Sequence, residues 1–383
     1  MLFAAAILTL LIWVYLLLAR GEFWRVQEPP AGLLRGNPAR IAVVIPARDE
    51  ADVIGRAVTS LLQQRGMHLL HIFLVDDGSS DGTATIARNA ATTLGGCADL
   101  TIVESQPLPA GWSGKLWAVH QGVDRAQDWR PDFFLFTDAD IVHAPENLST
   151  LVALAETRKC DLVSFMVALH CQTPAEKLLI PAFVYFFFKL YPPQWIADER
   201  RSTAGAAGGC VLLRPAALRA AGGVAAIRHE VIDDCALAAS VKRNGGRLWL
   251  GATNSAQSVR PYGGFGGIGN MISRTAFNQL RHSALLLLVA VAGMAATYLL
   301  PPALTVFSHH LAPSLVGGAA WLLMAISFLP VLRMYRLSPL WALTLPLVAL
   351  FYMGATIHSA WKYWIGRGGE WKGRFQDPVR EQR

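Results

Sequence analysis

The hydrophobic residues of this chain form long uncharged runs at both ends and short segments between them. Four stretches contain no Asp, Glu, Lys or Arg: Met1–Ala19, Ala284–Phe307, Leu311–Leu332 and Leu337–Trp361. Each is close to or above the length of about 20 residues that crosses a bilayer core of about 30 Å as a helix. The pattern therefore predicts a transmembrane anchor over residues 1–20 and about three transmembrane helices within 284–364. A water-facing domain over 38–283 and a basic tail over 365–383 complete the expected organisation.

The position of the basic residues that flank the first run distinguishes an anchor from a secretory signal peptide. A signal peptide has basic residues before its apolar stretch and small residues at a cleavage site. Here Arg20 and Arg25 follow the run, which favours a retained anchor and a cytoplasmic domain in a bacterial-type inner (plasma) membrane. With three C-terminal spans the basic tail would then lie outside, against the same rule, so the sequence leaves the side of the tail open.

Between the long runs, short apolar segments alternate with segments of helical spacing. Strands are predicted over Ile41–Pro46, Leu69–Val75, Thr101–Glu104, Phe133–Thr137 and Asp161–Phe165, and helices over Asp52–Gln64, Asp81–Asn89, Lys115–Asp128 and Pro145–Thr157. This alternation is typical of a Rossmann-like α/β domain with a mainly parallel sheet. In such sheets ligands bind at the carboxyl ends of the strands.

Two other segments depart from this alternation. The stretch of about 175–195 is aromatic and interrupted by Pro181 and Lys189, which favours a helix in the membrane interface. A buried core helix is the alternative. The glycine-rich Gly263–Gly269 lies far from any strand–helix–strand start, so we expect a flexible loop near the membrane rather than a dinucleotide site.

Composition and charge narrow the function classes. Of the chain, 53% is hydrophobic and the formal net charge is +7. The basic residues cluster beside the apolar runs and in the tail, which indicates contact with anionic lipid headgroups and no nucleic-acid partner. The five cysteines are scattered and include no Cys-x-x-Cys pair, so neither a zinc site nor a disulfide framework is indicated.

Acidic residues follow two of the predicted strands. Asp76 and Asp77 open the stretch VDDGSSDGT, whose carboxylates can accept hydrogen bonds from a nucleoside. An ordinary strand–turn–helix connection is equally compatible with that composition. Asp138 and Asp140 follow the strand FLF. Two carboxylates at a strand end can bind one hard cation such as Mg²⁺ or Mn²⁺.

Two further features are candidates for chemistry. Lys115 stands at the start of a predicted helix, where a lysine can contact phosphate, and Asp233 and Asp234 are adjacent in HEVIDDCALA. A helix N-cap explains such a pair structurally, whereas a raised pKa in one member would suit a general base. The sequence contains no P-loop motif and no Gly-x-Ser-x-Gly nucleophile elbow.

The order of these elements resembles the family 2 glycosyltransferases, which have the GT-A fold. It runs from the stretch IPARDE through DDGS, Lys115, the motif DAD and Gly208-Gly209 to Asp233-Asp234. The likeness covers about Ile41 to Arg281. PLPAGWSGKLWAVHQG and the layout of the apolar runs are most similar to the hopene-associated branch of that family.

The resemblance implies a role for each matching residue. The expected donor-binding residues are Pro46, Ala47, Glu50, Asp76, Asp77, Lys115 and Asp138. Asp140 and Asp138 would hold the divalent metal, Mg²⁺ or Mn²⁺. Asp234 would be the general base, with Asp233 beside it where the family usually has Glu. The expected acceptor or phosphate contacts are Gly208, Gly209, Arg274, Gln279 and Arg281.

The implied activity is inverting transfer of one sugar from a nucleotide-diphosphate sugar, with a UDP-sugar favoured, to a hydroxyl of a lipid such as a hopanoid. A polyprenyl-phosphate or polysaccharide glycosyltransferase is the alternative. Processive members have Gln-x-x-Arg-Trp after the base, and the matching stretch around Gln279 and Arg281 lacks its spacing and its Trp. A nucleotide-binding membrane scaffold or transporter is the alternative of another class, disfavoured because the apolar runs lack charged residues.

Overall fold

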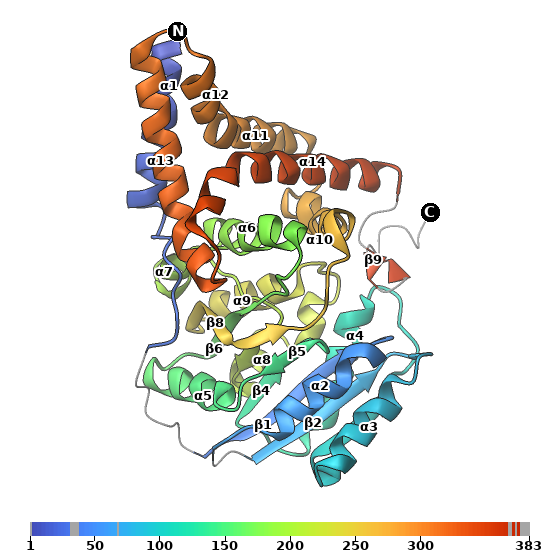
Figure 1. Ribbon diagram of the computed structural model, residues 1–383. Coiled ribbons are helices and arrows are strands. Elements are labelled where there is room, and N and C mark those ends of the chain that lie inside the picture. Colours follow the sequence, from blue (N-terminus) through green and yellow to red (C-terminus); the bar gives the residue numbers. More distant parts are fainter. Residues whose placement is uncertain (1, 31–37, 67–68, 367–369, 372–373, 376–383) are drawn as a thin grey trace. The chain divides into compact units, whose positions relative to one another are not determined.

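The protein divides into two compact units in a computed structural model that describes residues 2–30, 38–66, 69–366, 370–371 and 374–375. The sheet unit comprises Gln27–His170, Ile196–Arg260 and Glu370–Arg383. The helical unit comprises Met1–Val26, Cys171–Trp195 and Pro261–Gly369. Figure 1 shows the elements of both units in sequence colours.

The sheet unit is built on eight strands in the order β3-β2-β1-β4-β7-β6-β8-β5. Its strands are β1 (Arg40–Ala47), β2 (Leu69–Asp76), β3 (Leu100–Glu104), β4 (Phe133–Phe136), β5 (Ile141–His143), β6 (Leu162–Ala168), β7 (Val211–Leu213) and β8 (Leu248–Ser258). The pairs β1–β2, β1–β4, β2–β3 and β6–β8 are parallel, whereas β7 and β5 pair antiparallel. The predicted mainly parallel α/β sheet is confirmed.

The five predicted strands are present near their expected bounds, and β5, β7 and β8 are additional. The helices of this unit are α2 (Ala51–Leu62), α3 (Thr83–Thr93), α4 (Gly114–Gln127), α5 (Asn147–Thr157), α8 (Pro215–Ala220) and α9 (Asp233–Arg243). A two-stranded pair, β9 (Glu370–Trp371) with β10 (Arg374–Phe375), follows near the C-terminus. The core forms where the apolar faces of α2 and α5 pack against one face of β1. The opposite face of β1 packs against α4.

The contact between α4 and the sheet depends on Gly122. A Cβ at this position would lie 2.5 Å from Val44 Cγ1 and 2.9 Å from Val75 Cγ2. Real Cβ atoms do not approach so closely, so only glycine lets the helix lie this near to β1 and β2. The position of the whole helix, including its first turn, therefore depends on this glycine.

The helical unit holds the long apolar runs. Its helices are α1 (Leu2–Ala19), α6 (Pro174–Leu190), α10 (Gly264–Gln279), α11 (Ala284–Met294), α12 (Leu300–Phe307), α13 (Leu311–Met334) and α14 (Leu345–Trp364), and α7 (Pro193–Ala197) lies at its boundary. A π-helical turn over Ala295–Leu299 joins α11 to α12. Within the part of the chain that the structure describes, four segments are long and apolar enough to cross a membrane: Leu2–Ala19, Ala284–Phe307, Leu311–Met334 and Pro339–Trp364. These segments support membrane association.

The expected loop over Gly263–Gly269 is wrong, because α10 begins at Gly264. Gly263 adopts a left-handed φ of 66° before the helix, and Ile268 is fully buried. A Cβ at Gly267 would lie 1.5 Å from the carbonyl oxygen of Tyr262. The glycines thus allow a tight turn into a helix that is stabilised by packing on α14 rather than by intrinsic propensity.

Replacing Gly122 by Ala should force α4 away from the sheet. We expect Gly122→Ala to lower the free energy of unfolding by about 1–3 kcal/mol, the usual cost of overpacking a core. Arg125→Ala, on the exposed side of the same helix, is the control and should change stability little. Thermal unfolding of the purified protein in detergent measures both, and equal stability of the two variants would contradict the close approach.

Candidate active site

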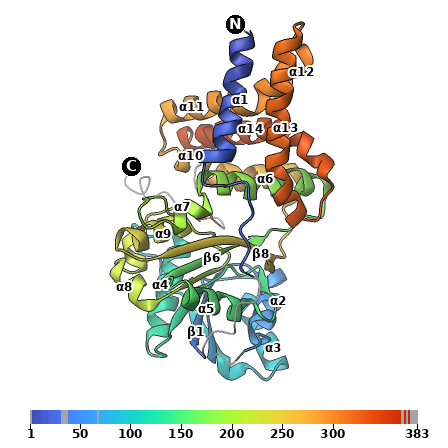
Figure 2. The ribbon, with the colours of Figure 1, turned by 90° about the vertical axis from the view of Figure 1, so that its left-hand side faces the viewer.

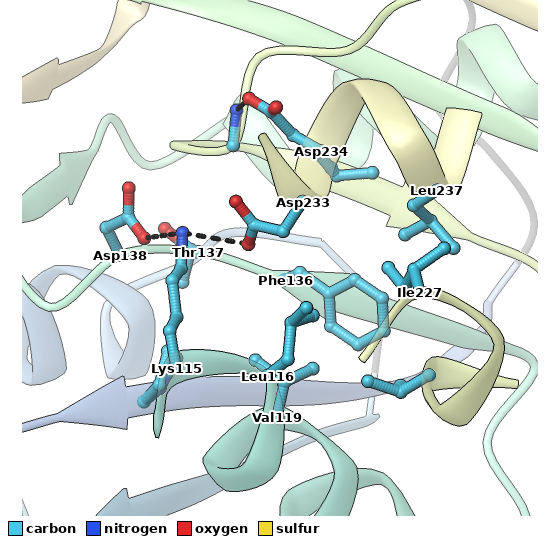
Figure 3. A pocket seen from close by; sticks show the side chains of 14 residues that line it. Lys115, Leu116, Val119, Phe136, Thr137, Asp138, Ile227, Asp233, Asp234 and Leu237 are labelled. Atoms are coloured by element: carbon cyan, nitrogen blue, oxygen red, sulfur yellow. Dashed lines mark hydrogen bonds and ion pairs between the residues drawn. The ribbon is translucent and has the colours of Figure 1, made fainter. Parts of the chain in front are cut away.

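A single lysine joins three segments of the sheet unit at one point. Lys115 Nζ lies 3.1 Å from Asp138 Oδ1 and 3.2 Å from Asp233 Oδ2. Figure 3 shows these side chains converging, with Asp234 beside them. Lys115 is the second residue of α4, Asp138 follows β4, and Asp233 begins α9. The three segments therefore meet through one ion-pair cluster.

The protein surroundings keep Lys115 charged. Its side chain is 19% exposed, and this burial alone would lower the pKa. The negative charges of Asp138, Asp233 and Asp234 outweigh that cost and raise the pKa of Lys115 well above its ordinary value. A permanent positive charge therefore stands among the carboxylates.

Asp234 is held by the backbone. Its Oδ2 accepts a hydrogen bond of 2.7 Å from the N–H of Gly208, and its Oδ1 accepts one of 2.7 Å from the N–H of Cys235. Desolvation, followed by the negative charge of Asp233, raises the pKa of Asp234 to about 6, although Lys115 and the two N–H donors act in the opposite direction. A carboxylate poised near neutrality suits general acid–base work.

A recess opens beside this cluster. Its polar end is formed by Lys115, Asp138, Asp233 and Asp234 (Figure 3). Apolar side chains line the rest: Leu116, Val119, Phe136, Val211, Val224, Ile227 and Leu237. Apolar walls with a few convergent charged groups are typical of ligand sites.

Asp140, the second acidic residue of the motif DAD, contacts residues other than Lys115. Asp140 Oδ2 accepts a 2.6 Å hydrogen bond from the Ser258 hydroxyl and lies 3.7 Å from Arg260 Nε. Arg260 also forms an ion pair with Glu50. Burial, followed by the charge of Asp138, raises the pKa of Asp140. The end of β8 and the start of α2 thus meet at the motif.

Asp76 and Asp77 stabilise the turn after β2. The Asp76 carboxylate accepts a 2.9 Å hydrogen bond from the Ser79 N–H, and Asp77 pairs with Arg48 at 3.5 Å. The N–H of Asp77 also donates to the carbonyl of Ala47 at the end of β1. The Asp76 side chain therefore stabilises the turn, whereas the Asp77 side chain links it to Arg48 after β1, and nucleoside contacts for both stay predictions.

The structure brings together six of the predicted site residues around the recess: Pro46, Lys115, Asp138, Gly208, Asp233 and Asp234. Gly209 does not line it, and its carbonyl accepts a hydrogen bond from Thr137. The predicted contacts Arg274 and Gln279 lie on α10, in the helical unit, and Arg281 follows that helix. Gln279 accepts a 3.0 Å hydrogen bond from the hydroxyl of Tyr191.

Sequence reasoning missed Arg260, Ser258 and Arg48. Ser258 ends a strand that the pattern did not predict, and Arg260 follows it just before Pro261. An arginine at the carboxyl end of an additional strand was the available signal. Arg48 lies within the stretch IPARDE, but nothing in the sequence links it to Asp77.

The donor set around the motif DAD fits a hard divalent cation that is shared with phosphate. Among the described residues there is no group of three or more His, Cys, Asp or Glu that could hold a metal alone. Mg²⁺ is commonly held by one or two carboxylates, with phosphate oxygens and waters completing its shell. Asp138 and Asp140 supply two such carboxylates, each of which also lies beside a cation of the protein, Lys115 and Arg260 respectively.

Residues 42–221 match the family model described as "Glycosyl transferase family 2". This region, which begins in β1 and ends just after α8, is therefore similar to the family 2 glycosyltransferases. It contains Lys115, Asp138, Asp140 and Gly208, whereas Asp233 and Asp234 lie beyond it.

A solved structure shows the same fold. The mannosyltransferase PcManGT from Pyrobaculum calidifontis, in complex with GDP-Man and Mn²⁺, covers 94% of this chain and 99% of its own, with a TM-score of 0.55 and 18% sequence identity. At that identity the likeness concerns the fold alone. The expected GT-A fold is confirmed by this match and by the family 2 region.

Curated relatives carry the name 4,4'-diaponeurosporenoate glycosyltransferase. The protein from Staphylococcus aureus (strain USA300) is 31% identical over 135 residues, 35% of this chain and 33% of its own length. The protein from strain MRSA252 is 30% identical over the same extent. The chain thus matches about a third of the length of these relatives.

Removing the charge of Lys115 should destabilise the sheet unit in a pH-dependent manner. We expect Lys115→Met to cost about 1–3 kcal/mol, because partly buried carboxylates lose their counter-charge. Lys115 also lowers the pKa of Asp234, so its loss raises that pKa further above the unfolded value. Stability then falls as pH rises over a wider range, and the deficit should be larger at pH 8 than at pH 5.

Thermal unfolding at both pH values measures this effect. Arg125→Met, an exposed cation on the same helix, is the matched control and should show no such pH dependence. A deficit for Lys115→Met that is equal at pH 5 and pH 8 would contradict the coupling between Lys115 and Asp234.

Proposed function

We propose that this protein is a membrane-bound inverting glycosyltransferase that moves one sugar from a nucleotide-diphosphate sugar to a hydroxyl group of a lipid. The observation that carries the proposal is the cluster in which Lys115 contacts Asp138 and Asp233 while Asp234 has a pKa near neutrality. The family 2 match supports glycosyl transfer, and the apolar segments support a lipid acceptor.

The proposed reaction needs a base but no covalent nucleophile. Asp234 takes the proton from the acceptor hydroxyl while its oxygen attacks the anomeric carbon of the donor. The bond from that carbon to the diphosphate oxygen breaks, and the diphosphate leaves with the electron pair. Attack from the side opposite the leaving group inverts the anomeric centre.

The remaining groups position the donor and balance its charge. Lys115 is proposed to contact the sugar or the phosphates, together with Pro46, which borders the same recess. Asp76, Asp77, Ala47 and Glu50 are proposed to border the nucleoside. A divalent cation, Mg²⁺ or Mn²⁺, bound by Asp138 and Asp140 would neutralise charge that develops on the departing diphosphate. Gly208 and Gly209 are proposed on the acceptor side, with Arg274, Gln279 and Arg281 as further contacts.

The acceptor is proposed to be a lipid alcohol, with a hopanoid as the leading candidate and a polyprenyl phosphate or polysaccharide as the alternative. The name of the Staphylococcus aureus relatives denotes a carboxylate acceptor. A carboxylate is already ionised at neutral pH and needs no base, whereas a hydroxyl needs one. The properties of Asp234 therefore favour a hydroxyl. A nucleotide-binding scaffold or transporter does not need a carboxylate with the raised pKa of Asp234.

The first test is transfer by membranes that contain the protein. Membranes are supplied with labelled UDP- and GDP-sugars in Mg²⁺ or Mn²⁺, and the labelled lipid and its anomeric configuration are identified. Asp234→Asn should lower the transfer rate by about 10²–10⁴-fold, because the base is lost, and leave nucleotide-sugar binding intact. Asp124→Asn, an exposed carboxylate on α4, is the control.

The outcomes separate the alternatives. Nucleotide binding without transfer by the wild type would indicate a scaffold or transporter. Undiminished transfer by Asp234→Asn would exclude Asp234 as the base and would point to an acceptor that is already ionised.

The second test is the pH dependence of transfer. Asp234 acts in its ionised form, so the rate should rise with pH through about 6, the pKa that desolvation and Asp233 give it. The charge of Asp233 raises that pKa, so Asp233→Asn should move the rising limb to lower pH. An unchanged limb in Asp233→Asn would assign it to another group.

A further inference from the structure

Within the helical unit the four membrane-length segments do not share one direction. α1, α12 and α13 pack along one another. Trp13 Nε1 of α1 donates to the carbonyl of Thr297 in the π-helical turn before α12 at 2.9 Å, and Ser314 Oγ of α13 donates to that of Thr305 in α12 at 2.8 Å. Figures 1 and 2 show α1 and α13 side by side, and Figure 1 shows both α14 and α11 running crosswise to them. Helices that cross one bilayer tilt only modestly from its normal, so neither α14 nor α11 can cross together with α1 and α13.

α14 instead lies alongside α10. Phe351 packs near Phe265 with ring centroids 6.1 Å apart, and about two turns further along α14 Ser359 Oγ accepts a 3.0 Å hydrogen bond from the N–H of Phe277. Near its end Tyr363 lies 5.5 Å from the same Phe277 ring. The two helices therefore run in the same direction in contact over most of the length of α10.

The polar residues of α10 and of the turn after it decide which set of helices spans. Asn270, Arg274, Asn278 and Arg281 recur at intervals of three to four residues, and both arginines are exposed. A charged side chain at the centre of a bilayer is costly. This stripe therefore requires α10 to lie where water or headgroups reach it, and α14 lies at the same level.

The outer face of α14 is apolar. Leu347, Leu350, Ile357, Trp361 and Trp364 are 66%, 54%, 48%, 54% and 58% exposed, respectively. Their spacing places them on one side of the helix, away from α10. Leucines followed by tryptophans, with Lys362 beside them, are typical of a helix that lies in the membrane interface.

We propose that α14 lies in the plane of the membrane interface with this face in the lipid, and that the C-terminal part crosses the bilayer twice rather than three times. The first crossing is made by the π-helical turn and α12, residues 295–307, which pack along α1 and α13, whereas α11 runs crosswise before them. The second is α13. Together with α1 these give three crossings, so the chain after α14 returns to the side on which α1 enters the sheet unit.

This arrangement reconciles the basic tail with the positive-inside rule. The basic residues from α14 onward are Lys362, Arg367, Lys372, Arg374, Arg380 and Arg383. With two C-terminal crossings they share a side with Arg20 and Arg25, which follow α1. The inference does not depend on the proposed enzymatic function.

Cysteine labelling in intact cells tests the number of crossings. Cys97 is exposed on the sheet unit and reports its side; Ser308→Cys and Gln382→Cys, each in a Cys97→Ser parent, report the turn after α12 and the tail. With a membrane-impermeant maleimide, Gln382→Cys should match Cys97, and Ser308→Cys should show the opposite accessibility. Gln382→Cys that labels together with Ser308→Cys, or Ser308→Cys that labels together with Cys97, overturns the proposal.

Spin-label depth provides a second measurement in reconstituted protein. Labels at Leu347→Cys and Ile357→Cys, in the Cys97→Ser parent, should report the same shallow depth. A label at Leu322→Cys, at an exposed position of α13, should be deep. If α14 crossed the bilayer, two positions ten residues apart would differ in depth by about 15 Å. A difference in depth of that size would overturn the proposal independently of the cysteine labelling.

Discussion

The ion pairs of Lys115 are the interaction on which the candidate site depends. One ammonium group contacts Asp138 and Asp233 and also lowers the pKa of Asp234. Without a central cation, three carboxylates from segments far apart in the sequence would repel one another, and the least costly response would be protonation of one of them. The lysine thus lets α4, β4 and α9 converge while Asp234 retains a pKa at which it can exchange a proton near neutrality.

Much of the sheet unit was predictable because its strands are continuous β-branched and aromatic runs that stop at Pro, Asp or Gly. Strands β5 and β7 have three residues each and give too short a pattern. β8 was missed because polar residues such as Asn254 and Gln257 interrupt it. In α10, tertiary packing on α14 overrides the low helix propensity of glycine. The membrane segments were predictable by length, but their directions depend on helix–helix contacts that hydropathy does not contain.

The candidate site was predictable to a similar degree. Motif order located Lys115, Asp138 and Asp233-Asp234, because each follows a strand or begins a helix at one edge of the sheet. It did not reveal that Asp140 lies beside Arg260, since that contact joins residues more than a hundred positions apart along the chain. The side chain of Asp76 binds its own turn and that of Asp77 pairs with Arg48, so an acidic residue at a strand end is not by itself evidence of a ligand contact.

Gly122 lies seven residues, or about two helical turns, after Lys115 on the same helix. The helix is rigid over that distance, so its separation from the sheet at Gly122 also determines the position of the Lys115 ammonium group. A methyl group added there would change neither a charge nor a hydrogen bond of the site, yet it would shift the cation relative to its carboxylates. A substitution can thus alter the site without contacting any of its residues. The distance between α4 and the sheet is one variable through which it can change the proton affinity of the carboxylates beside Lys115.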